Sequence, residues 1–167
     1  ALLLVDTVSS LGTTDYRHDD WGVDVAVCAS QKGLMLSPGL SFNALSDKAM
    51  LAAQHAELPK AFWDWAPILS FNERGFFPYT PATTLLFGLE AALEMLLEEG
   101  LDQVFARHAR AAEATRRAVR AWGLELQCAD DGQHANSITG FRMPEGDDAD
   151  QLRRLILDEF NLSLGKG

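Results

Sequence analysis

Three short apolar runs dominate the first third of the chain. ALLLVD at residues 1–6 and VDVAVCAS at residues 23–30 are continuous runs, typical of strands buried on both faces of a parallel sheet. The connection between them is long enough for a crossover, so we expect the two strands to be parallel neighbours. A tight loop with Pro38 and Gly39 leads into the third run, GLSFNALS at residues 39–46, which predicts an antiparallel return.

Helical signals follow these runs. Ser46 is a candidate N-cap for a helix running toward Glu57, and the aromatic stretch 58–79 is interpreted as irregular. Thr80 as N-cap, Pro81 at the first position and a glycine stop predict a helix ending at Gly100, whose apolar positions 85, 86, 89, 93, 96 and 97 share one face. A second helix follows with these inward positions: Val104, His108, Ala111, Thr115, Val119 and Trp122.

The pattern changes after the second helix. LELQCA at residues 124–129 and NSITGFRMP at residues 136–144 predict strands, and DADQLRRLILDEF at residues 148–160 predicts an amphipathic helix. We expect an α/β unit over residues 1–100 and the first part of a smaller α+β domain over residues 101–167.

Composition narrows the class of protein. Hydrophobic residues make up 47% of the chain and the net charge is −10, which argues against nucleic acids and anionic membranes as partners. No apolar run reaches the ~18 residues that predict a membrane span. Cys28 and Cys128 lie in apolar stretches and are interpreted as buried, reduced thiols of a cytoplasmic protein. The chain starts without Met inside a strand pattern and stops at LSLGKG, so we expect an internal piece of a longer protein.

Two residues at strand ends carry the candidate chemistry. Asp6 and Lys32 follow the first two apolar runs, and open α/β sheets bind ligands beyond the carboxyl ends of their strands. Taken alone, an aspartate after a strand is usually a turn residue, and a loop lysine is usually solvated. As a pair they suit pyridoxal 5′-phosphate (PLP), because the amine forms a Schiff base with the aldehyde and the carboxylate pairs with the protonated pyridine nitrogen. Arginine is unsuited to the lysine position because it does not release its proton.

Longer motifs point to a family. The segments VDTVSSLG, DDWGVDVAVCASQKGLMLSPGLSF and FFPYTPATTLLFGLEAALEMLLEEGLDQVFARH resemble the class V aminotransferases of PLP fold type I, within which serine–glyoxylate and alanine–glyoxylate aminotransferases are most similar. The resemblance covers nearly the whole chain. It implies the C-terminal part of the large PLP-binding domain, followed by a truncated small domain.

The resemblance assigns roles to single residues. Lys32 is the implied Schiff-base and catalytic lysine, Asp6 the partner of the pyridine nitrogen, Val8 a contact of the ring face and Gln31 a donor to the phosphate. Thr80 is implied to reach the phosphate of the neighbouring subunit's cofactor in a homodimer with shared active sites, and helix capping is compatible with that role.

Tyr79 is the weaker phosphate candidate, since relatives often place a tyrosine a few residues before the threonine, where this chain has Phe76 and Phe77. The implied substrates are small amino acids and 2-oxo acids: serine or alanine donates the amino group in a ping-pong reaction and glyoxylate accepts it. The family's glycine-rich phosphate loop, its ring-stacking aromatic and its carboxylate-binding arginine are absent, so we expect these residues alone to be inactive.

Alternatives remain. A class V lyase or desulfurase needs a reactive cysteine on a mobile loop, and Cys128 lies on a predicted strand. A non-catalytic α/β binding domain would lack the cofactor altogether. Neither His18 nor His55 has an acid or cysteine at metal-ligand spacing, so no metal is expected. The aromatic stretch 62–79 is interpreted as subunit packing in preference to a substrate entrance.

Overall fold

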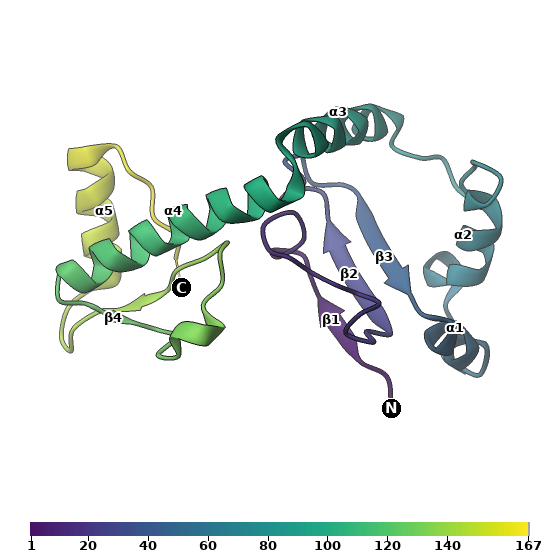
Figure 1. The fold of residues 1–167 in the computed structure, drawn as a ribbon, viewed down its shortest axis with the longest axis horizontal. Coiled ribbons are helices and arrows are strands. Elements are labelled where there is room, and N and C mark those ends of the chain that lie inside the picture. The colour runs from purple at the N-terminus through teal and green to yellow at the C-terminus, as the bar shows by residue number, and fades with distance from the viewer. Residues whose placement is uncertain (167) are drawn as a thin grey trace. The chain divides into compact units, whose positions relative to one another are not determined.

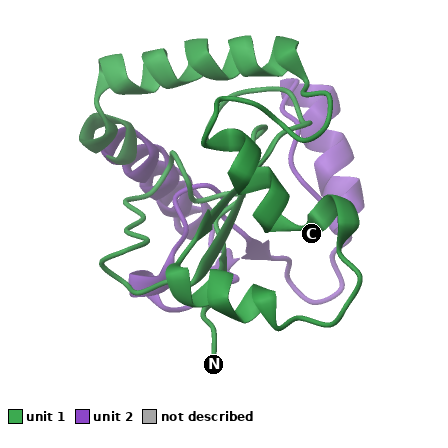
Figure 2. Cartoon of the chain, turned by 90° about the vertical axis from the view of Figure 1, so that its right-hand side faces the viewer, with its two compact units in different colours: residues 1–105 green, residues 106–167 purple. Residues whose placement is uncertain are grey.

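The computed structural model describes residues 1–166, and the chain divides into two compact units, residues 1–105 and residues 106–167 (Figure 2). None of the helices in the described part is long and apolar enough to cross a membrane. The strands are β1 (Leu4–Asp6), β2 (Val25–Ala29), β3 (Ser41–Leu45), β4 (Glu125–Leu126) and β5 (Phe141–Arg142). The helices are α1 (Asp47–Gln54), α2 (Trp65–Asn72), α3 (Thr83–Glu99), α4 (Leu101–Ala121) and α5 (Ala149–Phe160), with 3₁₀ turns at Ala61–Trp63 and Asp131–Gln133.

The first unit contains a three-stranded sheet in the order β1-β2-β3 (Figure 1). β1 and β2 are parallel, with Asp6 opposite Val27. β2 and β3 are antiparallel, with Ala29 opposite Ser41. The predicted pairing and strand directions are therefore confirmed, because crossover and tight-loop lengths constrain strand direction.

The expected burial of the first strand is wrong. Leu2, Leu3 and Leu4 are between 39% and 64% exposed, whereas Val25, Ala26 and Cys28 of β2 are buried. The physical reason is position in the sheet, since β1 is an edge strand that pairs only with β2 among the strands of residues 1–166. A continuous apolar run predicts a strand but does not say what covers it.

A buried carboxylate joins three elements at the amino end of β2. Asp24 Oδ2 accepts hydrogen bonds from Lys48 Nζ and from the backbone N–H of Leu3, both at 2.8 Å, and Oδ1 accepts one from Ser46 Oγ at 2.9 Å. These bonds, that of Lys48 first, lower the pKa of Asp24 to about 2. These bonds fix the amino end of β2, which is the end away from Lys32, to the start of α1.

Side-chain caps mark the starts of α1 and α2. Ser46 caps α1 as predicted, accepting from the backbone N–H of Ala49, although α1 ends at Gln54. The stretch interpreted as irregular contains a 3₁₀ turn and α2, so that prediction is wrong; Asp64 caps α2 by accepting from the backbone N–H of Ala66. A buried cluster of Cys28, Leu34, Leu96 and Val104, with Leu11, Leu36, Phe42 and Leu89 packed against it, forms the core of this unit.

The second unit contains the antiparallel pair β4–β5 and the amphipathic helix α5, as the pattern predicts. Asp148 caps α5 by accepting from the backbone N–H of Asp150 at 2.8 Å. The prediction of the inward face of α4 is partly wrong. Val104 and Val119 are buried as expected, but three predicted inward positions are exposed, namely Ala111, Thr115 and Trp122. Ala112 and Arg116 are buried in their place, because the buried stripe is displaced by one residue. The division into a large and a small domain stays a prediction.

Candidate active site

Two loops leave the same edge of the sheet, one after β1 and one after β2. Asp6 is the last residue of β1, and the pairing continues one residue further through Thr7, whose N–H and Oγ1 both donate to the carbonyl of Val27, at 2.8 and 2.9 Å. β2 ends at Ala29, three residues before Lys32. Because the strands are parallel neighbours, the segments carrying Asp6 and Lys32 begin side by side at the carboxyl edge.

The Asp6 carboxylate caps its own turn. Oδ1 accepts a hydrogen bond from the backbone N–H of Val8 at 2.8 Å, which is the turn role expected of an aspartate after a strand. Within residues 1–166 no hydrogen bond reaches Oδ2, and the side chain is exposed. One carboxylate oxygen is therefore available to a ligand while the other holds the carboxylate in place.

A buried thiol lies behind this carboxylate. Cys28 is 3% exposed and donates to the carbonyl of Ala29 at 3.4 Å. Burial raises the pKa of the Cys28 thiol, and the negative charge of Asp6 raises it further. Cys28 is therefore a neutral core group, as the sequence predicts.

Lys32 projects from a loop whose two ends are fixed by one hydroxyl. Ser30 is fully buried; its Oγ donates to the carbonyl of Ser37 at 2.8 Å and accepts from the N–H of Leu40 at 3.2 Å. The carbonyl of Lys32 accepts from the N–H of Met35 at 2.9 Å, which closes a turn. The side chains of Gln31 and Lys32 are exposed and have no hydrogen-bond or ion-pair partner in the described part of the chain.

The other lysines of this unit are engaged. Lys48 Nζ is bonded to the buried carboxylate of Asp24, and Lys60 Nζ donates to the carbonyl of Ala53 at 2.7 Å. Lys32 is thus the lysine of residues 1–105 whose amine is not held by a neighbour. An unengaged primary amine and a carboxylate with one open oxygen, carried by loops that leave neighbouring parallel strands, are the donor set that the aldehyde and pyridine nitrogen of PLP require.

Thr80 and Tyr79 lie between α2 and α3, and the capping role predicted for Thr80 is wrong. α3 begins at Thr83, its N-cap is Ala82, and no side chain caps it. The N–H of Thr83 bonds the carbonyl of Pro81 at 3.0 Å, so the chain forms a turn before the helix starts. Thr80 is exposed, and the half-exposed ring of Tyr79 lies 4.9 Å from that of Phe62.

Hydrogen bonds connect only some of the predicted site residues in the described part of the chain. Among residues 1–166 no hydrogen bond joins Tyr79 or Thr80 to the loops that carry Asp6 and Lys32. The role of Thr80 toward a neighbouring subunit, like the ligand contacts of Val8 and Gln31, stays a prediction.

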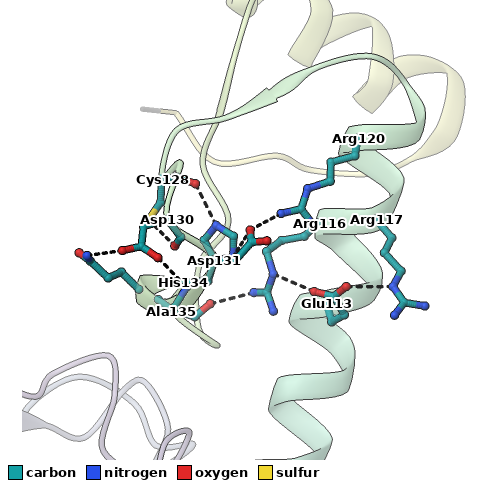
Figure 3. Close-up of polar contacts among 11 residues, drawn as sticks. Glu113, Arg116, Arg117, Arg120, Cys128, Asp130, Asp131, His134 and Ala135 are labelled. Atoms are coloured by element: carbon teal, nitrogen blue, oxygen red, sulfur yellow. Dashed lines mark hydrogen bonds and ion pairs between the residues drawn. The ribbon is translucent and has the colours of Figure 1, made fainter.

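Cys128, expected to be buried on a strand, lies instead in an exposed loop after β4 (Figure 3). β4 ends at Leu126, two residues before Cys128, so the thiol is not part of the strand. The thiol donates to the carbonyl of Asp130 at 3.5 Å. Ring atom Nε2 of His134 lies 2.8 Å from the carbonyl of Cys128, and the Asp130 carboxylate accepts from the N–H of Gly132 at 2.8 Å. Strand burial therefore does not exclude Cys128 as a desulfurase nucleophile, although hydrogen bonds within the loop hold it in place.

Two consecutive arginines of α4, Arg116 and Arg117, share one carboxylate partner. Glu113 accepts from Arg117 Nε at 2.9 Å and from Arg116 Nε at 3.2 Å, and these two bonds lower the pKa of its carboxyl group. Arg116 is buried and also donates to the carbonyl of Ala135, whereas Arg117 is exposed (Figure 3). This cluster stabilises the second unit. Within residues 1–166 no group of three or more His, Cys, Asp or Glu side chains is arranged to hold a metal ion.

Sequence reasoning missed the small residues that fix the two loops. Thr7 and Ser30 are buried hydroxyls next to the candidate residues, yet short polar side chains produce no periodicity. The only signal available is their place, a hydroxyl between an apolar strand and a loop, where side chain to backbone bonds are common.

Over residues 1–167 the chain matches the protein family described as aminotransferase class-V. The chain belongs to the class V aminotransferase family. L-aspartate–glyoxylate aminotransferase of Paracoccus denitrificans is 46% identical over 167 residues, and serine–glyoxylate aminotransferase of Arabidopsis thaliana is 45% identical over 168 residues. In each case the match covers 100% of this chain and 42% of the relative.

Solved structures of aminotransferases superpose on this chain. Alanine–glyoxylate aminotransferase from Nostoc sp. superposes with a TM-score of 0.88 at 33% identity, covering 100% of this chain and 45% of that protein. Pyridoxamine–pyruvate aminotransferase from Mesorhizobium loti gives 0.88 at 32% identity, covering 100% and 43%. The resemblance and the fold class are thus confirmed: this class V aminotransferase chain has the fold of part of a fold type I enzyme, spanning less than half the length of these relatives.

Proposed function

We propose that this chain is part of a PLP-dependent aminotransferase that transfers an amino group from a small amino acid to glyoxylate. The observation that carries the proposal is the class V match over the whole chain, with an unengaged lysine at the strand edge where the family resemblance requires one. Relatives named for aspartate, serine and alanine with glyoxylate make these three the donors to test.

The residues present fit the cofactor. Bound PLP supplies an electron sink for the electron pair released when the amino acid loses its α-proton. Lys32 Nζ would hold the cofactor through its aldehyde, and its freed amine would accept the donor's α-proton and pass it on within the same half-reaction. The open oxygen of Asp6 would pair with the protonated ring nitrogen, while the bond from the N–H of Val8 holds the carboxylate in place.

Other contacts complete the proposal. Gln31 donates to the phosphate from the residue beside the lysine, and Val8 lies against the ring. Thr80, and more weakly Tyr79, reach the phosphate of a second subunit's cofactor in a homodimer.

The enzyme works in the cytoplasm, and residues 1–100 and 101–167 belong to its large and small domains. A class V lyase or desulfurase is the second candidate, favoured by the exposed Cys128 thiol.

The test uses the full-length protein that contains these residues. Borohydride reduction with PLP bound, followed by peptide mapping, is expected to label Lys32. Lys48→Ala and Lys60→Ala are matched controls, since their amines are engaged elsewhere, and they retain labelling and turnover. Lys32→Ala abolishes labelling and lowers turnover roughly 10³-fold or more. Label on Lys48 or Lys60 contradicts the site.

Substrate assays separate the two candidates. Serine, alanine and aspartate are each offered with glyoxylate, and formation of glycine is measured. Transamination is supported if glycine forms and the Cys128→Ala variant produces it at the wild-type rate. Release of sulfide from cysteine that Cys128→Ala abolishes supports the desulfurase. Residues 1–167 expressed alone are expected to be inactive, and robust turnover from them contradicts the division of the site.

A further inference from the structure

The two loops at the strand edge touch through their backbones. Gly33 directly follows Lys32, and a Cβ atom placed on it lies 2.1 Å from the carbonyl oxygen of Leu11 and 3.1 Å from the carbonyl carbon of Gly12. On the opposite side, a Cβ on Gly12 lies 3.0 Å from both the carbonyl carbon and the oxygen of Gly33. Two glycines thus face each other where the Asp6 and Lys32 loops meet.

Neither loop is free to move aside. The N–H of Leu11 bonds the carbonyl of Thr7 at 3.0 Å, and Thr7 is bonded to the end of β2. On the lysine side, the N–H of Leu36 bonds the carbonyl of Ser30 at 3.0 Å. The atoms that a Cβ on Gly33 meets are therefore backbone atoms held by hydrogen bonds, and no side-chain rotation removes the clash.

A methyl group at position 33 forces the loops apart. A Cβ atom does not approach a backbone oxygen closer than about 3 Å, so relieving a 2.1 Å contact takes a displacement of about 1 Å. That displacement falls on the residue next to Lys32 and is directed away from the loop that follows Asp6. A misplacement of this size costs up to about 10²-fold in rate when it alters a reacting geometry.

We propose that Gly33, with Gly12 opposite it, is a positioning residue that sets the separation between the Lys32 amine and the Asp6 carboxylate. The inference rests on the proposed function, because it acts through the cofactor-binding role of Lys32. The absent side chain of Gly33 lets the lysine loop pack directly on the carbonyl of Leu11.

The test compares Gly33→Ala, Gly12→Ala and Gly22→Ala in the full-length holoenzyme. Gly22 has φ +63° and no atom within 4 Å of its Cβ position, whereas Gly12 has φ +79° and the close contact, so Gly22→Ala isolates the backbone strain. We expect kcat to fall about 10²-fold in Gly33→Ala, less in Gly12→Ala and little in Gly22→Ala. The pH at which the visible band of the lysine-bound cofactor titrates is expected to shift in the same order.

A crystal structure of cofactor-free Gly33→Ala gives a readout that does not depend on activity. The proposal expects residue 33 about 1 Å farther from Leu11, with the strands unchanged. The proposal is overturned if Gly33→Ala has wild-type turnover and its visible band titrates at the wild-type pH. It is also overturned if turnover is lost while the band titrates at the wild-type pH, because that result marks a merely structural effect. If Gly33→Ala does not fold, the milder Gly12→Ala decides by the same readouts. Failure of the proposed function is distinct, because borohydride then labels a lysine other than Lys32 in the unmodified enzyme.

Discussion

Replacing Ser30 by alanine removes one hydroxyl that fixes both ends of the Lys32 loop. Its Oγ donates to the carbonyl of Ser37 and accepts from the N–H of Leu40, and the side chain is fully buried. Alanine adds no clash, so the change isolates these two hydrogen bonds. The backbone bonds that Ser30 makes to Leu36 and Leu40 remain.

The expected magnitude follows from what happens to the two partners. A buried partner left without a hydrogen bond costs about 1–3 kcal/mol. Ser37 is exposed, so water replaces the lost donor there at small cost, whereas Leu40 is half-buried and its N–H loses the Ser30 hydroxyl as its acceptor. We expect the loop to open about 2 kcal/mol more easily, an increase of about 30-fold in the open population.

Hydrogen–deuterium exchange of the full-length protein, followed by mass spectrometry of peptides covering residues 30–40, measures that population. Exchange is expected to be about 30-fold faster in Ser30→Ala. Ser41→Ala is the matched control, because its exposed hydroxyl accepts only a 3.4 Å bond from Asn43 and its loss stays within about 0.5 kcal/mol. Unchanged protection in Ser30→Ala, or equal loss in both variants, refutes the reasoning.

Two further outcomes follow from the charged groups. The pKa of Asp24 is lowered from 3.8 to about 2 chiefly by its bond with Lys48, so its contribution is present above pH 3.8 and is lost as pH falls toward 2. Urea midpoints of wild type and Asp24→Asn should therefore differ at neutral pH and converge in that window; a constant difference contradicts the assignment. In α4, Arg116→Met is expected to destabilise by about 1–2 kcal/mol because a buried guanidinium loses its bonds to Glu113 and Ala135, and Arg117→Met by less than about 0.5 kcal/mol because its bond to Glu113 is exposed. Thermal unfolding ranks the two variants, and equal shifts contradict that burial decides.

Strand order was predictable because it depends on features that a sequence displays directly. Apolar runs mark β1, β2 and β3, and the length of each connection constrains whether neighbours run parallel or antiparallel. What covers a strand is not written in its own residues, so the exposure of Leu4 was missed. The N-terminus of α3 was missed for a related reason, since Thr80 and Pro81 satisfy the composition of a cap while the backbone turns once more before the helix.

The sequence singles out candidate reactive side chains, whose roles stay a prediction, but not the residues that support them. Asp6 and Lys32 are each ordinary at a strand end, and they are singled out by their pairing on neighbouring strands and by the family motifs around them. Gly12, Gly33 and Ser30 act through contacts with residues in a different loop or at the far end of their own. Such contacts depend on how two loops cross in space, and a glycine is equally frequent in turns where nothing approaches it, as Gly22 shows.

A lysine side chain has four rotatable carbons and loses about 2 kcal/mol of rotamer entropy when it is ordered. Lys32 has no partner among the described residues to order it, so the position of its amine is only as definite as the backbone that carries it. That backbone is held by a buried hydroxyl at Ser30 and by direct packing of Gly33 on Leu11, and neither constraint uses a flexible side chain. The reach of the amine is therefore set by rigid neighbours while its own torsions stay free, which suits the cofactor-binding and proton-transfer role proposed for Lys32.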